Sequence, residues 1–219
     1  MVSFRDKEMG KIKRNSEEGA FSFLLRIVRY INKNICGISK AIIFELDLEN
    51  PGLKTVTDLD LSFRLATKKD IDAMDKEHYD YDKSAKQYTM DRLAKGDRCI
   101  LALHNNKIIG YLWTMRDTME LTQFKHISLS KNRDYSYKEF VLKEFRGKRV
   151  HGSMYAYLID MLKKDGKRFV VTAVDTYNKS ALKIKRRGRY KTIGNIIYIR
   201  FFRLKYDYVK KKNLIYLQN

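Results

Sequence analysis

The residues best suited to chemistry form a basic turn, Arg146-Gly147-Lys148-Arg149, between an alternating aromatic segment and a helical pattern. A strand that enters a helix through such a turn presents the unpaired N–H groups of the first helical turn, and the helix dipole favours negative charge there. Three basic side chains add cations at the same point. The turn therefore indicates a phosphate-binding site, and the alternative is a cationic surface loop before a helix.

The segments on either side of the turn have the periodicity of regular elements. Tyr135 to Leu142 alternates as a half-buried strand does, and a helical pattern follows Arg149. Residues 168–175 are apolar and β-branched, which predicts a second strand. Asn178 then suits the N-cap of a helix that continues to Arg187. The apolar residues of the first helical pattern are Met154, Tyr157, Leu158, Met161 and Leu162.

The turn resembles the acyl-CoA signature of the GCN5-related N-acetyltransferases, in which a strand ends in Val-x-Pro-x-x-Arg-Gly-x-Gly-x-Gly/Ala before a helix. The matching residues are Val141, Arg146, Gly147 and Val150. The departures are Lys143 at the proline, Arg149 at the second glycine and His151 at the final Gly/Ala, with Gly152 one place late. The turn is therefore bulkier than the family pattern. Downstream, the order of Asn178, Ser180, Ala181, Gly188 and Tyr190 is also similar to the family.

The upstream half has the element order of the same family. Residues 61–67 alternate as a strand, and Thr67 with Asp70 forms a capping-box pattern for a helix. Residues 82–95 predict a second helix, and residues 99–113 predict a hairpin. The resemblance implies an α/β (α+β) fold: a mixed, mostly antiparallel central sheet with helices on both faces, splayed between two parallel central strands.

The chain of 219 residues is long enough for one domain with additions at both ends. We expect an N-terminal extension over residues 1–50, with a basic tail, an amphipathic helix at 21–35 and an added strand. A linker at 51–60 contains the chain's single proline. The acetyltransferase-like domain is expected at 61–204 and a basic tail at 205–219. Residues 21–35 suit a helix packed on the domain or on a second subunit, as in a homodimer, or a helix on an anionic membrane surface.

The formal net charge is +20, from 46 basic and 26 acidic residues. Such a basic protein invites a nucleic-acid interpretation, but most aromatic residues alternate within predicted strands, where a core role fits better. Cys36 and Cys99 have no metal-ligand spacing, and the four histidines are scattered. We therefore expect a reduced, cytoplasmic protein without a metal, and nucleic acid as an unlikely partner.

The resemblance implies a binding site for acetyl-CoA, the acyl donor. Backbone groups of Phe140, Val141 and Leu142 would bind the pantetheine amides, and one N–H there would polarise the thioester carbonyl. Asn178 and Ser180 would lie beside the pantetheine arm. The pyrophosphate would bind at Arg146, Gly147, Lys148, Arg149, Val150, His151 and Gly152.

The reaction requires a general base for the acceptor and a proton donor for the leaving thiolate, and the sequence offers candidates for both. Glu139 is the leading general base because it shares a strand face with Val141. The family often places its acidic residue two positions earlier, where Tyr137 stands, and a plain salt bridge is the alternative role for Glu139. The leaving thiolate usually takes a proton from a tyrosine seven residues after the Asn, and that position is Lys185. Tyr177 and Tyr190 are fallback candidates.

The acceptor is expected to approach the side that carries His78, Tyr79 and Tyr81, together with His126. Rings and carboxylates there would suit a sugar or another small metabolite. The predicted activity is acetyl transfer to an amine or hydroxyl by direct attack in a ternary complex. Two alternatives stay open: a catalytically silent acyl-CoA-binding or regulatory module, and a basic protein that binds nucleic acid or a membrane surface.

Overall fold

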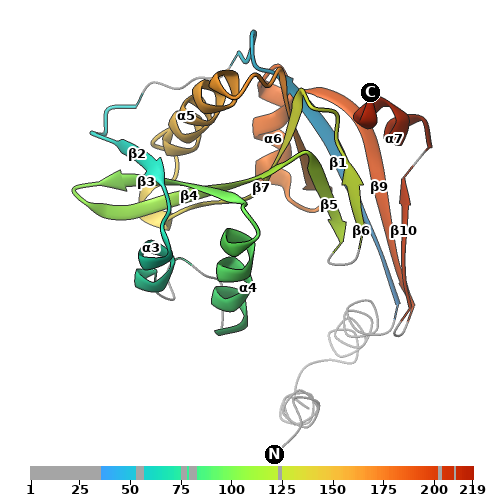
Figure 1. Cartoon of the computed structure of the whole chain (residues 1–219), viewed down its shortest axis with the longest axis horizontal. Helices are drawn as coiled ribbons and strands as arrows, with labels where there is room; N and C mark the ends of the chain where they lie inside the picture. Colours follow the sequence, from blue (N-terminus) through green and yellow to red (C-terminus); the bar gives the residue numbers. More distant parts are fainter. Residues whose placement is uncertain are drawn as a thin grey trace, which may run out of the picture. The chain divides into compact units, whose positions relative to one another are not determined.

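The computed structural model describes residues 36–52, 57–74, 78, 83–122, 125–201, 204–209 and 211–219 (Figure 1). The chain divides into two compact units, residues 1–39 with 197–208 and residues 40–196 with 209–219. The described part of the smaller unit contains the beginning of one strand, the end of another and most of a third. The larger unit contains the candidate site. The helix predicted at residues 21–35 and the basic tail before it lie outside the described residues.

The elements follow the predicted order over most of the chain. The strands are β1 Cys36–Asp47, β2 Ser62–Leu65, β3 Arg98–His104, β4 Lys107–Arg116, β5 Thr118–Thr122, β6 Lys125–Ser128, β7 Arg133–Val141, β8 Phe169–Asp175, β9 Lys191–Phe201 and β10 Leu204–Val209. The helices are α3 Lys68–Ala73, α4 Lys83–Ala94, the short 3-10 helix η1 Lys143–Phe145, α5 Val150–Lys164, α6 Lys179–Arg187 and α7 Lys211–Gln218.

In the larger unit the strands lie in the order β9-β1-β8-β7-β4-β3-β2. β7 and β8 are parallel, whereas the pairs β1–β8, β2–β3, β3–β4 and β4–β7 are antiparallel. This confirms the predicted mixed, mostly antiparallel sheet with two parallel central strands. The added strand β1 lies beside β8. In the smaller unit β10 is the neighbour of the end of β9.

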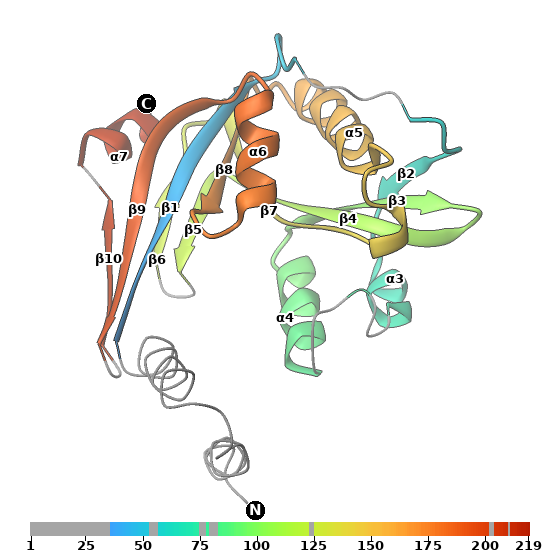
Figure 2. The same cartoon turned by 180° about the vertical axis from the view of Figure 1, so that it is seen from behind.

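Helices cover both faces of this sheet, as predicted (Figures 1 and 2). Alternate residues of β3 show the two faces: Ile100 and Ala102 pack in the core beneath α5, and Leu101 and Leu103 pack on the α3 and α4 side. α6 lies on the α5 side, where Leu182 packs against β1 and β8. The predicted capping box also forms, because Thr67 and Asp70 each accept from the other's backbone N–H at the start of α3.

The two parallel strands separate part-way along their length. They pair from Arg133 opposite Phe169 to Ser136 opposite Thr172. β7 nevertheless continues to Val141 and β8 to Asp175, without pairing to each other. The unpaired ends open on the side of the sheet where the basic turn enters α5. This is the predicted splay, and it places backbone groups of two strands around a common gap.

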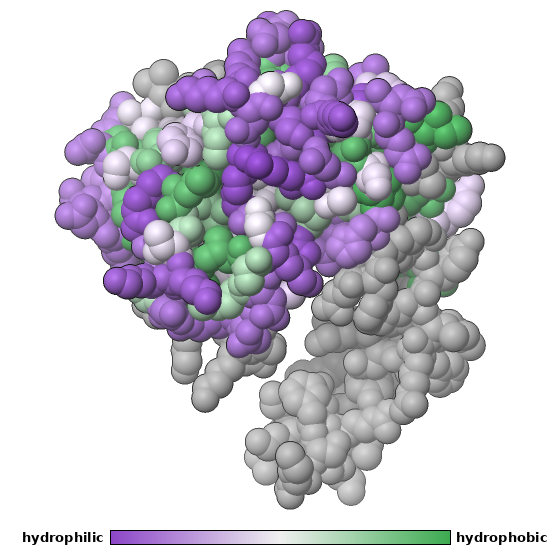
Figure 3. All heavy atoms as spheres, viewed as in Figure 1, coloured by the Kyte–Doolittle hydropathy of each residue, from purple (hydrophilic) through white to green (hydrophobic). Residues whose placement is uncertain are grey.

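Several elements were not expected from the sequence. The hairpin β5–β6 is short and follows directly after β4. Where a basic tail is predicted at 205–219, the described residues contain the end of β10 and α7. Leu217 of α7 is fully buried, and its carbonyl accepts from the Ser130 N–H at 2.9 Å. The buried Leu217 therefore anchors α7 within the larger unit. Among the described residues, hydrophilic ones predominate on the face shown in Figure 3, with smaller apolar areas between them.

Gly110 allows β4 and β7 to approach each other beside the gap. A Cβ at this position would lie 2.8 Å from the Phe140 carbonyl oxygen and 3.4 Å from the Met154 side chain. We expect Gly110→Ala to lower the free energy of unfolding by about 1–3 kcal/mol, because the methyl group pushes against the backbone of β7. Chemical denaturation measures the change, and an unaltered midpoint would show that the strands separate without cost.

Candidate active site

The basic turn has the backbone geometry of an anion site. Gly147 and Arg149 both have left-handed φ values, +80° and +62°. α5 begins directly after Arg149, and this N-cap residue makes no side-chain hydrogen bond to the helix. The first N–H groups of a 15-residue helix therefore have no capping side chain. Such N–H groups, at the positive end of the helix dipole, favour a bound anion.

The basic side chains of the turn are partly engaged within the protein. Arg146 Nε donates to the Val141 carbonyl at 2.9 Å, and its guanidinium lies 6.0 Å from the Phe140 ring centre. The Lys148 ammonium lies 5.3 Å from the ring centre of Phe145. Leu142 is buried and its N–H donates to Ile109 at 2.9 Å. Of the backbone groups predicted to meet pantetheine, the Val141 carbonyl and the Leu142 N–H are thus already paired.

A β-bulge at Lys138 decides which face each neighbouring side chain occupies. The register shifts from Glu139 opposite Leu112 to Tyr137 opposite Trp113, and Lys138 has a φ of +49°. Because Lys138 is the extra residue, Tyr137 and Glu139 lie on opposite faces of the sheet. Tyr137 faces α4 and Glu139 faces α5 and α6. Simple alternation would have put them on the same face.

Glu139 is the centre of a polar group between β7, α5 and α6, which we call the Glu139 cluster. Its Oε2 lies 2.6 Å from His151 Nε2, and its Oε1 accepts from the Tyr155 hydroxyl and from Lys185 Nζ, the latter at 3.3 Å. Lys185 Nζ also donates to the Tyr155 hydroxyl at 2.8 Å and to that of Tyr190 at 3.5 Å. The structure thus brings together Glu139, His151, Lys185 and Tyr190, which the sequence placed in separate motifs.

The protonation states of the cluster follow from burial and charge. Burial alone would raise the pKa of Glu139, but the Lys185 ammonium and His151 outweigh it and hold that pKa well below its usual range. Burial lowers the pKa of Lys185, and Glu139 opposes this change. Burial, with Glu139 beside them, raises the pKa of Tyr155 and Tyr190. Glu139 is therefore an anion held by the Lys185 ammonium and by hydrogen bonds, which makes it a poor proton acceptor.

Tyr155 was not among the residues selected from the sequence. It is fully buried, and its hydroxyl contacts Glu139, Lys185 and Ser136. One signal was available, because Tyr155 follows His151 by one helical turn and so shares its side of α5. The ring centres of these two residues lie 4.8 Å apart.

Tyr137, the other candidate base, belongs to a separate ion-pair network on the α4 face. Its hydroxyl donates to Asp97, which pairs with Arg92 at 2.6 Å, and Arg92 also reaches Glu120 at 3.2 Å. Burial and the Asp97 carboxylate raise the pKa of Tyr137. A phenol with a raised pKa that already donates its proton to a carboxylate is suited to structure rather than to accepting a proton.

Asn178 and Ser180 are placed at the start of α6. Asn178 Oδ1 accepts from the Ala181 N–H at 3.1 Å and from the Ser180 hydroxyl at 3.0 Å, so Asn178 caps the helix. The fallback candidate Tyr177 is 74% exposed and is not part of the Glu139 cluster.

The acceptor-side residues are placed only in part. His78 is buried, its Nε2 lies 2.9 Å from the Ile108 carbonyl oxygen, and its ring centre lies 6.4 Å from that of Phe140. It therefore sits beside the α3 and α4 face of β4 and β7. His126 is exposed on β6. Tyr79 and Tyr81 lie outside the described residues.

Comparison with known families identifies the chain. The sequence model of the Acetyltransferase (GNAT) family matches residues 63–188, which are more than half of the chain. The chain belongs to the GNAT family. This confirms the resemblance carried by the turn and by the order of elements. GNAT proteins are acetyltransferases, and acetyl-CoA is the donor that the family uses.

Solved structures share the fold at low sequence identity. A GNAT acetyltransferase from Colwellia psychrerythraea superposes with a TM-score of 0.55 at 12% identity, covering 81% of this chain and 62% of its own. A conserved Staphylococcus epidermidis protein of unknown function superposes with a TM-score of 0.53 at 14% identity, covering 84% and 68%. A Drosophila protein superposes with a TM-score of 0.53 at 12% identity, covering 82% of this chain and 57% of its own. The chain thus spans about three fifths of the length of two of these proteins. No curated protein sequence matches it.

The residues around the gap fit acetyl-CoA at the start of α5. Between β7, α5 and α6, however, side chains leave less room for it. The uncapped start of α5 and the separated strands suit a phosphate and an extended chain. By contrast, the His151 side chain and the Glu139 cluster occupy the region between β7, α5 and α6. Among the described residues, no group of histidine, cysteine and acidic side chains could hold a metal ion, and no described helix is long and apolar enough to cross a membrane.

Arg149 carries backbone strain that glycine would relieve. Replacing it with glycine should raise the free energy of unfolding by about 1 kcal/mol, since a side chain at a left-handed φ is unfavourable. Arg146→Gly is the matched control: Arg146 has a φ of −68° and loses its bond to Val141, so this change should lower stability. Thermal unfolding of both variants measures the difference, and equal shifts would contradict it.

The depressed pKa of Glu139 gives a pH dependence with a definite sign. Its folded pKa lies below the ordinary value of 4.5, so the stabilisation is present above that pH and is lost as the pH falls, because the unfolded chain takes up a proton first. We expect Glu139→Gln to flatten the fall in unfolding free energy below about pH 5. The exposed Glu144→Gln serves as the control and should keep the wild-type slope.

Glu139→Gln also leaves Lys185 buried without its counter-ion, which costs about 3–5 kcal/mol when a buried pair is broken. The double variant Glu139→Gln/Lys185→Met should recover much of that loss, because neither charge remains. Urea denaturation at neutral pH separates the two effects. A double variant no more stable than the single one would show that the pair is not coupled.

Proposed function

We propose that this GNAT protein transfers an acetyl group from acetyl-CoA to an amine or hydroxyl of a small acceptor, such as a sugar. The observation that carries the proposal is the separation of β7 and β8 after Ser136 and Thr172, next to the uncapped start of α5. The N–H groups of α5 would bind the pyrophosphate. The pantetheine arm would extend along the unpaired end of β7 toward the gap.

The Glu139 cluster supplies a proton for the leaving group in this proposal. Attack on the thioester breaks the carbon–sulfur bond, and the coenzyme leaves as a thiolate that takes up one proton. Lys185 Nζ is a buried ammonium beside the Tyr155 hydroxyl at 2.8 Å. Burial lowers its pKa, which favours release of a proton. Glu139 keeps Lys185 charged before the reaction, so Glu139 acts as a positioning residue.

The proton of the acceptor then leaves to water, and Lys185 takes up a proton from water before the next turnover, so no net proton is gained or lost. Glu139 is a poor base because its pKa is depressed, and the Tyr137 hydroxyl donates to Asp97 on the opposite face. An amine that enters uncharged needs only a weak proton acceptor after it has attacked. This replaces the role first expected of Glu139 with one that agrees with its ion pairs.

Direct attack without a covalent enzyme intermediate agrees with the state of Cys99. Burial raises the pKa of the Cys99 thiol well above its ordinary value, so it is not a thiolate at neutral pH. Its sulfur lies within β3, on the α3 and α4 side of the sheet. The cytoplasmic location expected from cysteine usage remains part of the proposal.

One observation favours a second candidate, a silent acyl-CoA-binding module. His151 and the Glu139 cluster fill space between β7, α5 and α6, and every proton acceptor of the cluster is already paired. A protein that binds acetyl-CoA but releases no thiol with any acceptor would fit this alternative.

Donor binding is tested by straining one glycine of the turn. Gly147→Val places a branched residue at a φ of +80° with open space around its Cβ, and Gly166→Val does the same at +72° beyond the far end of α5. Both variants should lose similar stability, but only Gly147→Val should weaken acetyl-CoA binding, by about tenfold or more because the amides at the start of α5 are displaced. Calorimetric titration measures the affinities. Equal affinities in the two variants would place the donor elsewhere.

Proton donation is tested at Lys185. With an acceptor found by screening amino sugars and polyamines for thiol release, Lys185→Met should lower kcat by about 100-fold, with little change in KM for acetyl-CoA. Tyr190→Phe removes only the most distant hydroxyl of the cluster and should stay near the wild-type rate. If kcat of Lys185→Met is unchanged across the pH range, water protonates the thiolate.

A further inference from the structure

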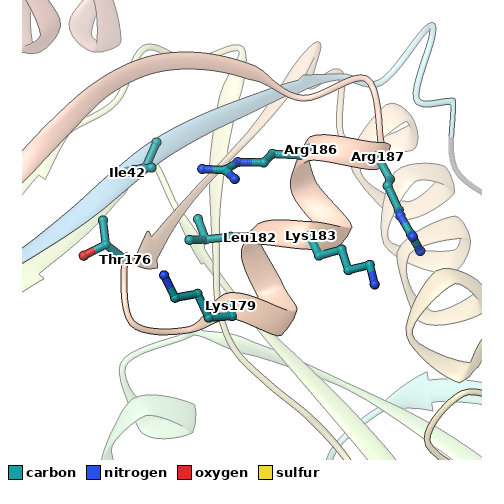
Figure 4. Close-up of a pocket in the computed structure, with 7 residues that line it drawn as sticks. All are labelled: Ile42, Thr176, Lys179, Leu182, Lys183, Arg186 and Arg187. Atoms are coloured by element: carbon teal, nitrogen blue, oxygen red, sulfur yellow. The ribbon is translucent and has the colours of Figure 1, made fainter.

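A hollow of about 340 Å³ lies against α6 (Figure 4). Its lining residues are Ile42 of β1, Thr176 after β8, and Lys179, Leu182, Lys183, Arg186 and Arg187 of α6. Figure 4 shows Lys179 and Arg186 directed toward the side of α6 on which Ile42 and Thr176 lie. Hollows of about 300–1,000 Å³ are typical of small-molecule sites.

Four cations line this hollow, and no ion pair with a described residue explains their presence. Lys179, Lys183, Arg186 and Arg187 are spaced by four, three and one residues, which places them on neighbouring positions of the helix surface. Their side chains are exposed, and no described residue forms an ion pair with any of them. α6 itself contains no acidic residue. The fifth cation of the helix, Lys185, is by contrast buried and paired with Glu139.

This arrangement opposes the stability of the helix. Like charges three or four residues apart repel, and a lysine at the first helical position faces the positive end of the dipole. α6 is instead held by the Asn178 cap, by Leu182 in the core and by Lys185. The four exposed cations therefore suit a bound anion that the chain itself does not supply.

The floor of the hollow is apolar. Leu182 is buried in a small core with Phe44 and Val174, and Ile42 packs against the same core. A ligand that matches both features has phosphate groups for the cations and a flat, weakly polar part for the floor. We infer that the hollow binds a nucleoside phosphate. This inference does not depend on the proposed transferase activity.

The first test uses ADP and calorimetry on the full chain at moderate salt. Lys179→Glu/Arg186→Glu should weaken ADP binding at least tenfold. The control Lys95→Glu/Lys164→Glu makes the same change in net charge at exposed lysines outside the hollow and should alter the affinity less than twofold. Equal losses in the two variants, or no loss in the first, would overturn the inference, because only general attraction to a basic protein would remain.

The second test separates the floor from the cations. Ile42→Ser should weaken ADP binding several-fold while leaving pyrophosphate binding unchanged. If wild-type protein binds pyrophosphate as tightly as ADP, the flat part of the ligand contributes nothing and the inference fails. It also fails if a single-stranded oligonucleotide binds through Lys179 and Arg186 and ADP does not. Thermal unfolding confirms that each variant is folded.

The ligand inferred here is a free nucleotide, and competition with CoA separates it from the nucleotide end of the donor. ADP that still binds in saturating CoA identifies a free nucleotide. ADP that is displaced by CoA, with CoA affinity reduced in Lys179→Glu/Arg186→Glu, would show that the hollow is only part of the donor site and would overturn the inference. Gly147→Val should weaken acetyl-CoA binding, as above, without removing ADP from the hollow. Failure of acetyl-CoA to bind wild-type protein would refute the transferase proposal while leaving the ADP result intact.

Discussion

The ion pair between Glu139 and Lys185 holds the site together, because it joins β7 and α6 through charge and α5 through the Tyr155 hydroxyl. A buried pair of this kind gains little net stability, since both charges lose their hydration. Its contribution is to fix positions. The further hydrogen bonds, between His151 and Glu139 and from Lys185 to the Tyr190 hydroxyl, restrict where α5 and α6 can lie relative to the end of β7. The elements on one side of the gap between the parallel strands are therefore fixed in position.

The bulge at Lys138 makes this arrangement available. Without the extra residue, Tyr137 and Glu139 would share a face, and one of two charged networks would have to enter the other's side of the sheet. With it, Arg92 and Asp97 neutralise the α4 side, and Lys185 neutralises Glu139 on the α5 side. A bulge beside the splay thus sorts two sets of buried charges onto opposite faces. Each set is then paired locally, which is the condition for burying it.

Patterns among residues close together in the chain predicted their elements correctly. Pairings between distant segments could not be predicted from the sequence. The capping box at Thr67 and the basic turn into α5 are set by residues close together in the chain, and both were predicted. The same holds for the cap at Asn178. The position of β1 beside β8 depends on pairing over more than 120 residues, and the bulge depends on the register of β4 against β7. Alternation alone would therefore put Tyr137 on the same face as Glu139, whereas the bulge separates them.

α6 shows how one basic segment can serve two purposes. The run from Lys183 to Arg189 reads in sequence as a single cationic cluster, but the structure divides it. Lys185 points inward because its neighbours in the helix, Leu182 and Ala181, anchor the same side to the core. The remaining cations of the helix point outward by the geometry of the helical turn. One helix therefore gives a buried counter-ion to Glu139 and a set of unpaired charges to a separate surface. Substitutions that remove the outward charges should leave the inward one in place, so the two roles of α6 can be separated by experiment.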